Sequence, residues 1–474
     1  MSAPVNLREV PLPSQSLDAL GEHLSDGAEA RLRASREAAA EILAARTIWW
    51  VNSTAQGGGV AEMLRTLPPY WRGDGLDARW LVLEAPRPFF AFTKRLHNLL
   101  HGIPLSIASS RRRRLYDAVS QEAGRQARAM VKPGDVVILE DPQVAGLAPE
   151  LAGSGAVVVW RSHVGTEEAN EHVEEAWEFL RPRVEDASAF VFSRSDYIPD
   201  FLAGRAYAIP PAIDPLSAKN RELTGAQAAA ILRRIGLADG RGPWQPATAA
   251  LQDGTVVTVT RRANVLRESR PPRLGENPLV VALARWDWLK DPIGILTGFA
   301  RHLDHPGARL VIAGPAAGAV ADDPGGRGVL RATRAAWHEL PAADRARIDV
   351  VSLPMVDLEE NALMVNALQR KADVVVKKSL QEGFGLGVTE GLWKGKPVVA
   401  TGVGGHKDQI EHDRSGLLLE HPADLREFAA AVDELLADED RAQAMAAAGR
   451  EHVRENFLAD SHFVNWIAVL RDLT

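Results

Sequence analysis

The sequence predicts an α/β protein with two doubly wound parallel sheets. Two series of short apolar runs alternate with helical patterns, and a glycine-rich loop follows the first of these runs. Such alternation is typical of parallel sheets that carry helices on both faces. The length of 474 residues also exceeds one ordinary core and suits two domains. We therefore expect two Rossmann-like domains that face each other across a cleft, with ligands at the carboxyl ends of the strands.

The first domain is predicted to span residues 1–215. Leu and Ala at helical spacing within 16–46 predict an amphipathic helix before the sheet. The dipeptide Pro210-Pro211 cannot continue a helix or a central strand, so we expect the domain to end near it. The strands of this domain are expected at the apolar runs 47–52, 79–83, 135–139, 155–160 and 188–193.

Residues 216–277 are expected to form a connector with one helix and an insertion rich in Gly, Pro, Thr and Arg. Within it, residues 254–259 could form an arm of a β-hairpin, but we favour a surface insertion. Residues 278–455 are predicted to be the second domain, and residues 456–474 a helix that crosses back to the first. The strands of the second sheet are expected at 279–284, 309–313, 347–352, 373–376 and 397–400.

The composition excludes several classes of protein. Hydrophobic residues make up 46% and charged residues 25%, as in an ordinary globular protein. The net charge of -7 argues against general nucleic-acid binding. With no cysteine, disulfides, thiolate nucleophiles and Cys-type zinc sites are excluded. No apolar run is long enough to cross a bilayer, and the first residues lack the pattern of a secretory signal, so we expect a cytoplasmic protein without a membrane partner.

The first candidate site is the loop Gly57-Gly58-Gly59, which follows the run 47–52 and precedes a helical pattern. Glycines let backbone amides approach a phosphate or a sugar closely, and the helix N-terminus adds partial positive charge. A purely structural turn explains this pattern equally well. The loop lacks the Lys and Ser/Thr of a phosphate-binding loop and the spacing of a dinucleotide fingerprint.

The second candidate is the pair Arg285 and Lys290, which directly follows the predicted strand 279–284. At the carboxyl end of a strand, the planar guanidinium and the ammonium could together neutralise a diphosphate. Taken alone, two solvated surface cations are the favoured interpretation.

The third and most specific candidate follows the predicted strand 373–376. Glu382 and Glu390 stand eight residues apart, with Gly383-Phe384-Gly385-Leu386 directly after the first of them. Exposed amides at this helix start would be donors for a sugar hydroxyl or a phosphate, and a carboxylate that accepts two hydroxyls suits a hexose or a ribose. A capped helix start with an acidic first turn is the alternative.

These features resemble the retaining glycosyltransferases of the two-domain GT-B fold, whose E-x7-E signature matches Glu382 and Glu390. More narrowly, the segments 49–64, 209–220 and 366–400 resemble the trehalose synthases of the glycosyl-transferring type. Those enzymes join the glucose of a nucleoside diphosphate glucose to free glucose. The likeness extends from about residue 15 to the C-terminus.

The resemblance implies a role for each matching residue on the donor side. Arg285 and Lys290 would hold the diphosphate and stabilise it as a leaving group. Glu382 would bind hydroxyls of the transferred sugar, and Glu390 the ribose. The donor-binding residues would further include Gly57, Gly58, Gly59, Gly383, Phe384, Gly385 and Leu386.

On the acceptor side, His163 matches a histidine near the sugar C6 and the reacting centre, although a lone histidine after a strand is more often structural. Thr93, His97 and Asn98 also match acceptor-side residues, with an ordinary helix face as the alternative. The usual His-Asp-Pro-Gln of the family reads Glu140-Asp141-Pro142-Gln143 here, and Gly165 stands where an Asp is expected. These departures bear on the acceptor, which Glu140 and Asp141 would bind, more than on the transfer reaction.

The expected substrates are therefore a nucleoside diphosphate hexose and a small polyhydroxylated acceptor, with no metal and no other cofactor. The resemblance leaves a homodimer open. Three alternatives stand beside this reading. They are a trehalose phosphorylase-like reaction, transfer involving a cyclitol or a modified sugar, and a non-catalytic sugar-nucleotide-binding protein.

Overall fold

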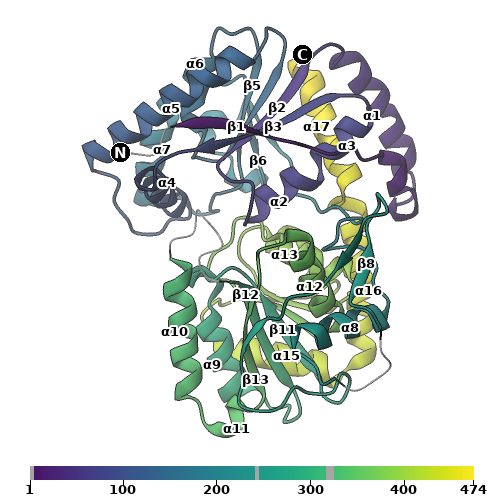
Figure 1. The fold of residues 1–474 in the computed structure, drawn as a ribbon. Helices are drawn as coiled ribbons and strands as arrows, with labels where there is room; N and C mark the ends of the chain where they lie inside the picture. Colours follow the sequence, from purple (N-terminus) through teal and green to yellow (C-terminus); the bar gives the residue numbers. More distant parts are fainter. Residues whose placement is uncertain (1–4, 241–244, 317–324) are drawn as a thin grey trace. The chain divides into compact units, whose positions relative to one another are not determined.

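Two seven-stranded sheets organise the chain, each in its own unit (Figure 1). The computed structural model describes residues 5–240, 245–316 and 325–474. The first unit runs to Ile213 and includes Phe457–Thr474, and the second unit is Asp214–Asn456. In each sheet all strands are parallel except one edge strand. The predicted class of two doubly wound α/β domains is therefore confirmed.

The first sheet contains all five predicted strands at its centre. Its two edges, β1 and β7, were not predicted; in β1 only Leu7 is buried, so an edge strand of this kind carries little apolar signal. β1 pairs antiparallel with β3, and the other pairs are parallel. The strands in sheet order are β1 (Asn6–Val10), β3 (Asp77–Glu84), β2 (Thr47–Asn52), β4 (Val136–Glu140), β5 (Val157–Ser162), β6 (Ala189–Phe192) and β7 (Ala206–Ala208).

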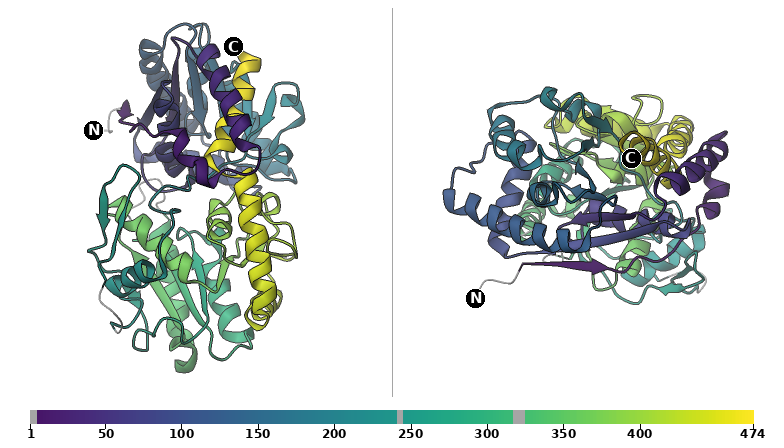
Figure 2. Two further views of the ribbon diagram at one scale, coloured as in Figure 1. Left: turned by 90° about the vertical axis from the view of Figure 1, so that its right-hand side faces the viewer. Right: turned by 90° about the horizontal axis from the view of Figure 1, so that it is seen from above.

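Helices cover both faces of this sheet. The core on one face is formed with α4 to α7. On the other face α1 and α17, from opposite ends of the chain, lie side by side (Figure 2). The helices are α1 (Ala28–Ile42), α2 (Gly59–Thr66), α3 (Pro68–Gly73), α4 (Arg87–Leu100), α5 (Ser110–Met130), α6 (Ala148–Leu151), α7 (Glu171–Val184) and α17 (Ala459–Leu473), with 3-10 turns at Leu17–His23, Ala145–Leu147, Ser195–Tyr197 and Asp200–Leu202.

The single helix expected over 16–46 is in fact two elements, a 3-10 turn and α1. Gly27, which precedes α1, has φ 72. That left-handed conformation interrupts a continuous helix and favours glycine.

The second sheet again contains the five predicted strands, flanked by the edge strands β10 and β16. β10 pairs antiparallel with β13, and the rest are parallel. In sheet order the strands are β10 (Asn264–Leu266), β13 (Ile348–Leu353), β12 (Arg309–Pro315), β11 (Leu279–Leu283), β14 (Val374–Lys377), β15 (Val398–Thr401) and β16 (Leu417–Leu419).

The helices of the second unit also form two layers. One core contains side chains of α9, α10 and α15, whereas α12 and α13 pack from the other face. In the described ranges, no helix is both long and apolar enough to cross a membrane. The helices are α8 (Gly225–Ile235), α9 (Pro292–His302), α10 (Gly326–Glu339), α11 (Ala342–Arg345), α12 (Leu358–Lys371), α13 (Leu386–Trp393), α14 (His406–Gln409), α15 (Leu425–Ala437) and α16 (Glu439–Asn456), with a 3-10 turn at Trp288–Lys290.

The segment expected as a connector, 216–277, lies within the second unit. It contributes α8 and the edge strand β10. Residues 254–259, for which we favoured a surface insertion, belong to a β-hairpin of β8 (Thr248–Ala250) and β9 (Val256–Thr258). Gly254 has φ 82 in the turn of this hairpin, and the preference for an insertion was wrong because so short a hairpin shows little apolar alternation.

The strand order gives each sheet one point at which successive connections leave in opposite directions. In the first sheet β2 lies between β3 and β4, and in the second β11 lies between β12 and β14. Open α/β sheets bind ligands at the carboxyl ends of the strands beside such a point. The loops after β2 and β4, and those after β11 and β14, are therefore the places to look for a site.

Candidate active site

At the carboxyl ends of β11 and β14, two of the predicted residues meet. Lys290 Nζ contacts the carboxylate of Glu382 directly, with side chains that are only 18% and 15% exposed. Ser379 Oγ donates a hydrogen bond to Glu382 Oε2 at 3.2 Å. Arg285 lies just past the end of β11 and is half-buried. The structure thus places a cation and a carboxylate together at the switch point of this sheet.

His406 completes the surroundings of Glu382. Its Nδ1 lies 2.9 Å from the Thr401 carbonyl oxygen, which accepts the N–H, and its Nε2 lies 3.7 Å from Glu382 Oε2. Burial lowers the pKa of His406 to about 4, so the ring is neutral at neutral pH. Nε2 therefore presents a lone pair toward this loop.

Two lysines at the end of β14 add positive charge to the same place. Lys377 Nζ donates to the Leu283 carbonyl, and burial lowers its pKa to about 8 despite the opposing charges of Glu390 and Glu382. Lys378 is buried and forms an ion pair with Asp291, which caps the N-terminus of α9. These contacts fix the end of β14 relative to the loop after β11.

The glycine-rich loop itself is covered rather than exposed. Gly383 and Phe384 are both buried, contrary to the exposed loop that the sequence suggested. The reason is the segment before and within α14: the Gly405 amide donates to the Gly383 carbonyl at 2.9 Å, and Gln409 Nε2 donates to the Phe384 carbonyl at 2.6 Å. Gly385 then caps α13, which begins at Leu386.

Gly385 is a position where only glycine fits. It has φ +85, and a Cβ there would lie 2.7 Å from His406 Nε2 and 2.9 Å from Glu382 Cγ. The family resemblance implies nucleotide binding and turnover at this site. We expect Gly385→Ala to lower both at least about tenfold, because it displaces Glu382 in addition to the about 1–2 kcal/mol that a left-handed Ala costs. Calorimetric titration with nucleoside diphosphates and assays of sugar transfer would measure this.

The matched control is Gly395→Ala. Gly395 has φ +63 with nothing within 4 Å of an added Cβ, so it carries the backbone cost without the steric clash. Equal losses of binding in the two variants would mean that the clash with Glu382 and His406 does not cause the loss.

The second predicted glutamate, Glu390 in α13, is 4% exposed. Lys219 Nζ lies 2.6 Å from its Oε1, and Gln369 Nε2 donates to its Oε2 at 3.2 Å. Burial by itself raises the pKa of Glu390, but the charges of Lys219, Lys394 and Lys377 outweigh it and hold the pKa below its ordinary value. Glu390 is therefore an ionised, firmly positioned carboxylate.

At the switch point of the first sheet, the glycine loop follows β2 as predicted. Gly57 and Gly58 have φ of 76 and 99, a conformation that favours glycine, and Gly59 begins α2. Asn52, the last residue of β2, supports the loop: its Nδ2 donates to the Thr54 carbonyl at 2.7 Å, and its Oδ1 accepts from Trp80 at 2.9 Å.

The carboxyl ends of β4 and β5 bring Glu140 and His163 together. Glu140 Oε2 lies 2.7 Å from His163 Nε2, and Ser193 Oγ lies 3.1 Å from His163 Nδ1. The His163 amide also donates to Asp141 Oδ1 at 2.8 Å. His163 is thus held at both ring nitrogens and at its backbone, and Glu140, which is 1% exposed, contacts the imidazole.

A buried arginine lies behind this histidine. Arg161 is fully buried, with Nη1 at 3.9 Å from Glu140 Oε1 and 3.3 Å from His462 Nε2. His462 Nε2 also accepts from Trp466 Nε1 at 3.2 Å, so its proton is on Nδ1. Burial and the charge of Arg161 lower the pKa of His462 well below its ordinary value. His462 is therefore neutral, and Glu140 lies within ion-pair distance of the Arg161 cation.

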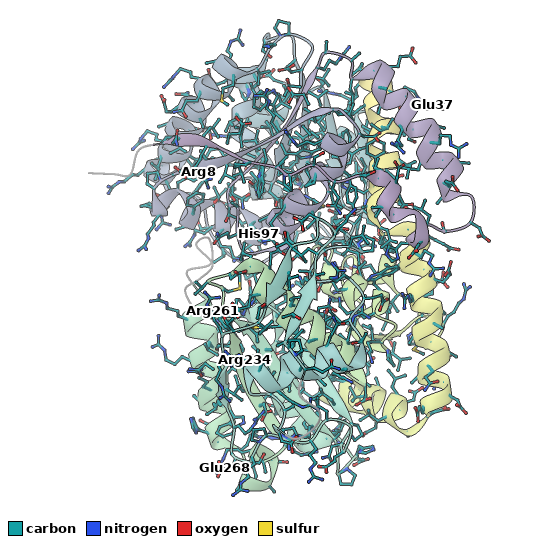
Figure 3. The ribbon with its side chains drawn as sticks, turned by 45° about the vertical axis from the view of Figure 1, so that its right-hand side comes forward. Arg8, Glu37, His97, Arg234, Arg261 and Glu268 are labelled. Carbon is teal, nitrogen blue, oxygen red and sulfur yellow. The ribbon has the colours of Figure 1, made fainter. Side chains whose placement is uncertain are left out.

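The predicted acceptor-side residues of α4 lie near His101, which contacts the segment after β5. The His97 ring (Figure 3) lies 5.0 Å from the His101 ring, and His101 Nδ1 is 3.2 Å from the Gly165 carbonyl oxygen. Asn98 Oδ1 is buried and has no hydrogen-bond partner among the described residues. Thr93 is 1% exposed, so its side chain packs inside the unit.

Comparison with known proteins identifies the family of this chain. The family model described as "Trehalose synthase, N-terminal domain" matches residues 50–199, and that described as "Glycosyl transferases group 1" matches residues 267–452. A trehalose synthase from Pyrococcus horikoshii is 32% identical over 436 residues, 92% of this chain and 92% of that protein. The chain belongs to the trehalose synthase family of glycosyltransferases.

Two further comparisons concern proteins outside the trehalose synthase family. A trehalose phosphorylase from Pleurotus sajor-caju is 27% identical over 450 residues, 89% of this chain but 57% of that protein. Among solved structures, a UDP-forming α,α-trehalose-phosphate synthase from Burkholderia xenovorans in complex with glucose-6-phosphate has a TM-score of 0.65 at 15% identity. The superposition covers 90% of this chain and 99% of that chain, and the likeness confirms the GT-B fold.

Several residues of this candidate site were missed by sequence reasoning. Lys219 and Gln369 hold Glu390, and His406 and Gln409 support the loop after Glu382. Lys219 and Gln369 lie inside segments that carry the family resemblance, but no spacing rule links them to Glu390. Only the folded chain shows these partners, because they are distant from the glutamates in sequence.

Proposed function

We propose that the protein is a retaining glycosyltransferase that moves a hexose from a nucleoside diphosphate sugar to a small polyhydroxylated acceptor. The observation that carries the proposal is Lys290 held against Glu382 at the switch point of the second sheet. An ammonium beside a carboxylate offers positive charge to a diphosphate and hydrogen-bond acceptors to a sugar.

On the donor side, Lys290 would exchange Glu382 for the diphosphate, with Arg285 as the second cation. Glu382, released from Lys290 but kept in place by Ser379, would accept hydrogen bonds from hexose hydroxyls. Glu390 would accept the ribose hydroxyls. In this scheme the C1–oxygen bond to the diphosphate breaks while the acceptor oxygen bonds to C1 on the same face, and the departing phosphate takes the acceptor proton.

On the acceptor side, we propose that the His163 ring forms a hydrogen bond with the acceptor or with the hexose. Glu140 would be the positioning residue for this ring. Both ring nitrogens of His163 are engaged, by Glu140 and by Ser193, so substrate would displace the neutral Ser193 contact rather than the carboxylate. Asp141, His97 and Asn98 would contribute to the acceptor side. Gly165 supports an acceptor other than glucose, because the carboxylate expected from the family is missing there.

The direct test is product analysis from a matrix of nucleotide sugars and acceptors. Release of nucleoside diphosphate that depends on an acceptor, with a disaccharide-type product whose α-configuration NMR establishes, is the expected result. Tight nucleotide binding without turnover across the whole matrix would instead indicate a sugar-nucleotide-binding protein.

A trehalose phosphorylase-like reaction is the second candidate, because the chain is also similar to a trehalose phosphorylase. In that reaction inorganic phosphate would take the position of the diphosphate beside Lys290. Trehalose breakdown that requires phosphate and no nucleotide would decide for it.

We also propose that no metal takes part, because Lys290 and Arg285 supply the positive charge for the diphosphate. In the ranges that the structure describes, no group of three or more His, Asp and Glu side chains could hold a metal ion. Initial rates of transfer should be unchanged by excess EDTA. A rate that falls with EDTA and returns with Mg²⁺ or Mn²⁺ would contradict this part of the proposal.

The pKa of Lys377, lowered by burial to about 8, gives donor binding a pH dependence. Below that pH the ammonium is charged and attracts the anionic nucleotide, and above it the charge is lost. We expect nucleoside diphosphate affinity to fall about tenfold as the pH rises through and above the pKa, with the midpoint raised by the bound anion.

Calorimetric titrations with UDP, ADP and GDP at a series of pH values would show this dependence. Lys377→Met should bind more weakly at neutral pH and lose the alkaline decline, whereas Lys132→Met, at an exposed position in the first unit, should keep it. An unchanged alkaline decline in Lys377→Met would assign the titration to another group.

A further inference from the structure

A cavity of about 290 Å³ lies at the amino end of the second sheet, at the edge opposite Lys290 and Glu382. Its wall includes Leu279 and Arg309, the first residues of β11 and β12, and Asp373 and Lys396, which come just before β14 and β15. The carboxyl ends of these strands point away from it. The cavity is therefore separate from the candidate active site.

The wall is rich in positive charge. Five cationic side chains and two carboxylates line the cavity: Arg273, Arg309, Arg370, Lys371 and Lys396 against Asp349 and Asp373. The rest of the lining is largely apolar and includes Leu232, Leu237 and Leu368. A pocket with this lining suits a ligand that has an anionic group and a compact carbon body.

The three arginines already have partners in the protein. Arg370 Nη1 lies 2.7 Å from Glu222 Oε2, and Arg273 Nη1 lies 3.1 Å from Glu276 Oε1. Arg309 Nη2 lies 3.6 Å from Asp349 Oδ1, and it shares this carboxylate with Arg267. Arg309 and Arg370 are thus held in the wall by these contacts, whereas Arg273 is half exposed.

The two lysines differ from the arginines. In the described part of the chain, neither Lys371 nor Lys396 donates a side-chain hydrogen bond or makes an ion-pair contact. The nearby carboxylate, Asp373, accepts from the Leu279 amide at 2.7 Å through Oδ2. Burial lowers the pKa of Lys396; Asp373 opposes this, and the charges of Lys371 and Arg370 add to it. Both lysines thus line one cavity, and an anion bound between their ammonium groups would be stabilised by both charges.

We propose that this cavity is a second ligand site, which binds a small phosphate monoester with Lys371 and Lys396 on the phosphate and the leucine-lined wall around the carbon body. Its volume equals that of about ten water molecules in the liquid, enough for a triose or hexose phosphate. Inorganic phosphate would use the ammoniums but leave the apolar wall without a partner. A monoester therefore fits the lining better than the free ion.

Isothermal titration calorimetry of the full chain would test the proposal with three probes: glycerol 3-phosphate, inorganic phosphate and glycerol. We expect the ester to bind about tenfold or more tightly than inorganic phosphate, and glycerol not to bind detectably. The double variant Lys371→Met/Lys396→Met should weaken ester binding at least about tenfold, because methionine keeps the length of the side chain but removes the charge.

The control variant is Lys132→Met, at an exposed position in the first unit, which should bind the ester as the parent protein does. Unchanged nucleoside diphosphate affinity in the double variant would show that its second unit is folded, and either single variant gives the same test if the double variant does not fold. Ester binding that is unaffected by these lysine substitutions would overturn the proposal, as would equal affinity for inorganic phosphate and the ester.

Discussion

Replacement of Lys290 by alanine is expected to lower kcat/KM for sugar transfer by about a hundredfold to a thousandfold. Lys290 contacts Glu382 at the carboxyl ends of β11 and β14, where a departing diphosphate would need its charge. Charge on the leaving group develops mainly in the transition state, so kcat should fall more than KM rises. Initial rates of nucleoside diphosphate release over a range of donor concentrations would measure both constants.

The companion variant is Glu382→Gln, which keeps the shape of the side chain but removes the charge that faces Lys290. Glu382→Gln should also lower the rate of transfer. It should raise KM for the hexose donor strongly and weaken binding of the free nucleoside diphosphate less. Lys132→Ala, at an exposed site, is the control for loss of a lysine. Full activity in Lys290→Ala would remove this residue from the proposed machinery.

The second large effect is expected on stability, from Glu140→Ala. Glu140 and the fully buried Arg161 lie 3.9 Å apart, and removal of the carboxylate leaves a buried cation without it. Loss of one partner of a buried ion pair typically costs about 3–5 kcal/mol. Urea unfolding followed by tryptophan fluorescence should therefore show a clearly lower free energy of unfolding.

A surface pair in the same unit provides the comparison. Arg8 and Glu84 lie 2.8 Å apart, with side chains that are 47% and 48% exposed. Glu84→Ala should cost less than about 1 kcal/mol, since exposed pairs contribute little. If both substitutions lowered the free energy of unfolding equally, the charge of the buried Arg161 would not need Glu140 for its stabilisation.

The sequence predicted the central strands of both sheets because each is a short, largely buried apolar run between helical patterns. It did not predict β1, β7, β10 and β16, which form the edges of the two sheets. A strand such as β1, with one buried residue, has a pattern that cannot be distinguished from a loop. The split of the first helix at Gly27 was missed because a single glycine within a periodic pattern gives no direct evidence of a left-handed turn.

In the structure, Lys290 and Glu382 lie in the segments that follow β11 and β14, whereas Glu390 lies within α13. For the first two residues the sequence predicted this placement, because chain order alone determines it. It could not show that Lys219 holds Glu390 or that His406 lies beside Glu382, since these contacts join distant segments. The sequence also did not show which residues of the site are buried. Gly383 is covered, although a glycine-rich loop usually suggests an exposed one.

One departure from the family now has a physical explanation. A Cβ at Gly165 would lie 2.4 Å from Tyr197 Cγ, so the aspartate expected there could not fit without a shift of the tyrosine. The Arg194 guanidinium lies over the Tyr197 ring at 5.3 Å and forms an ion pair with Glu167. The Tyr197 side chain thus occupies the space that a side chain at position 165 would need.

The most direct measurement is a crystal structure of the protein with a bound nucleoside diphosphate. We expect the β-phosphate within hydrogen-bond distance of Lys290 Nζ, with the contact between Lys290 and Glu382 broken and the ribose hydroxyls on Glu390. A nucleotide bound elsewhere, with Lys290 still on Glu382 and both glutamates untouched, would contradict the account.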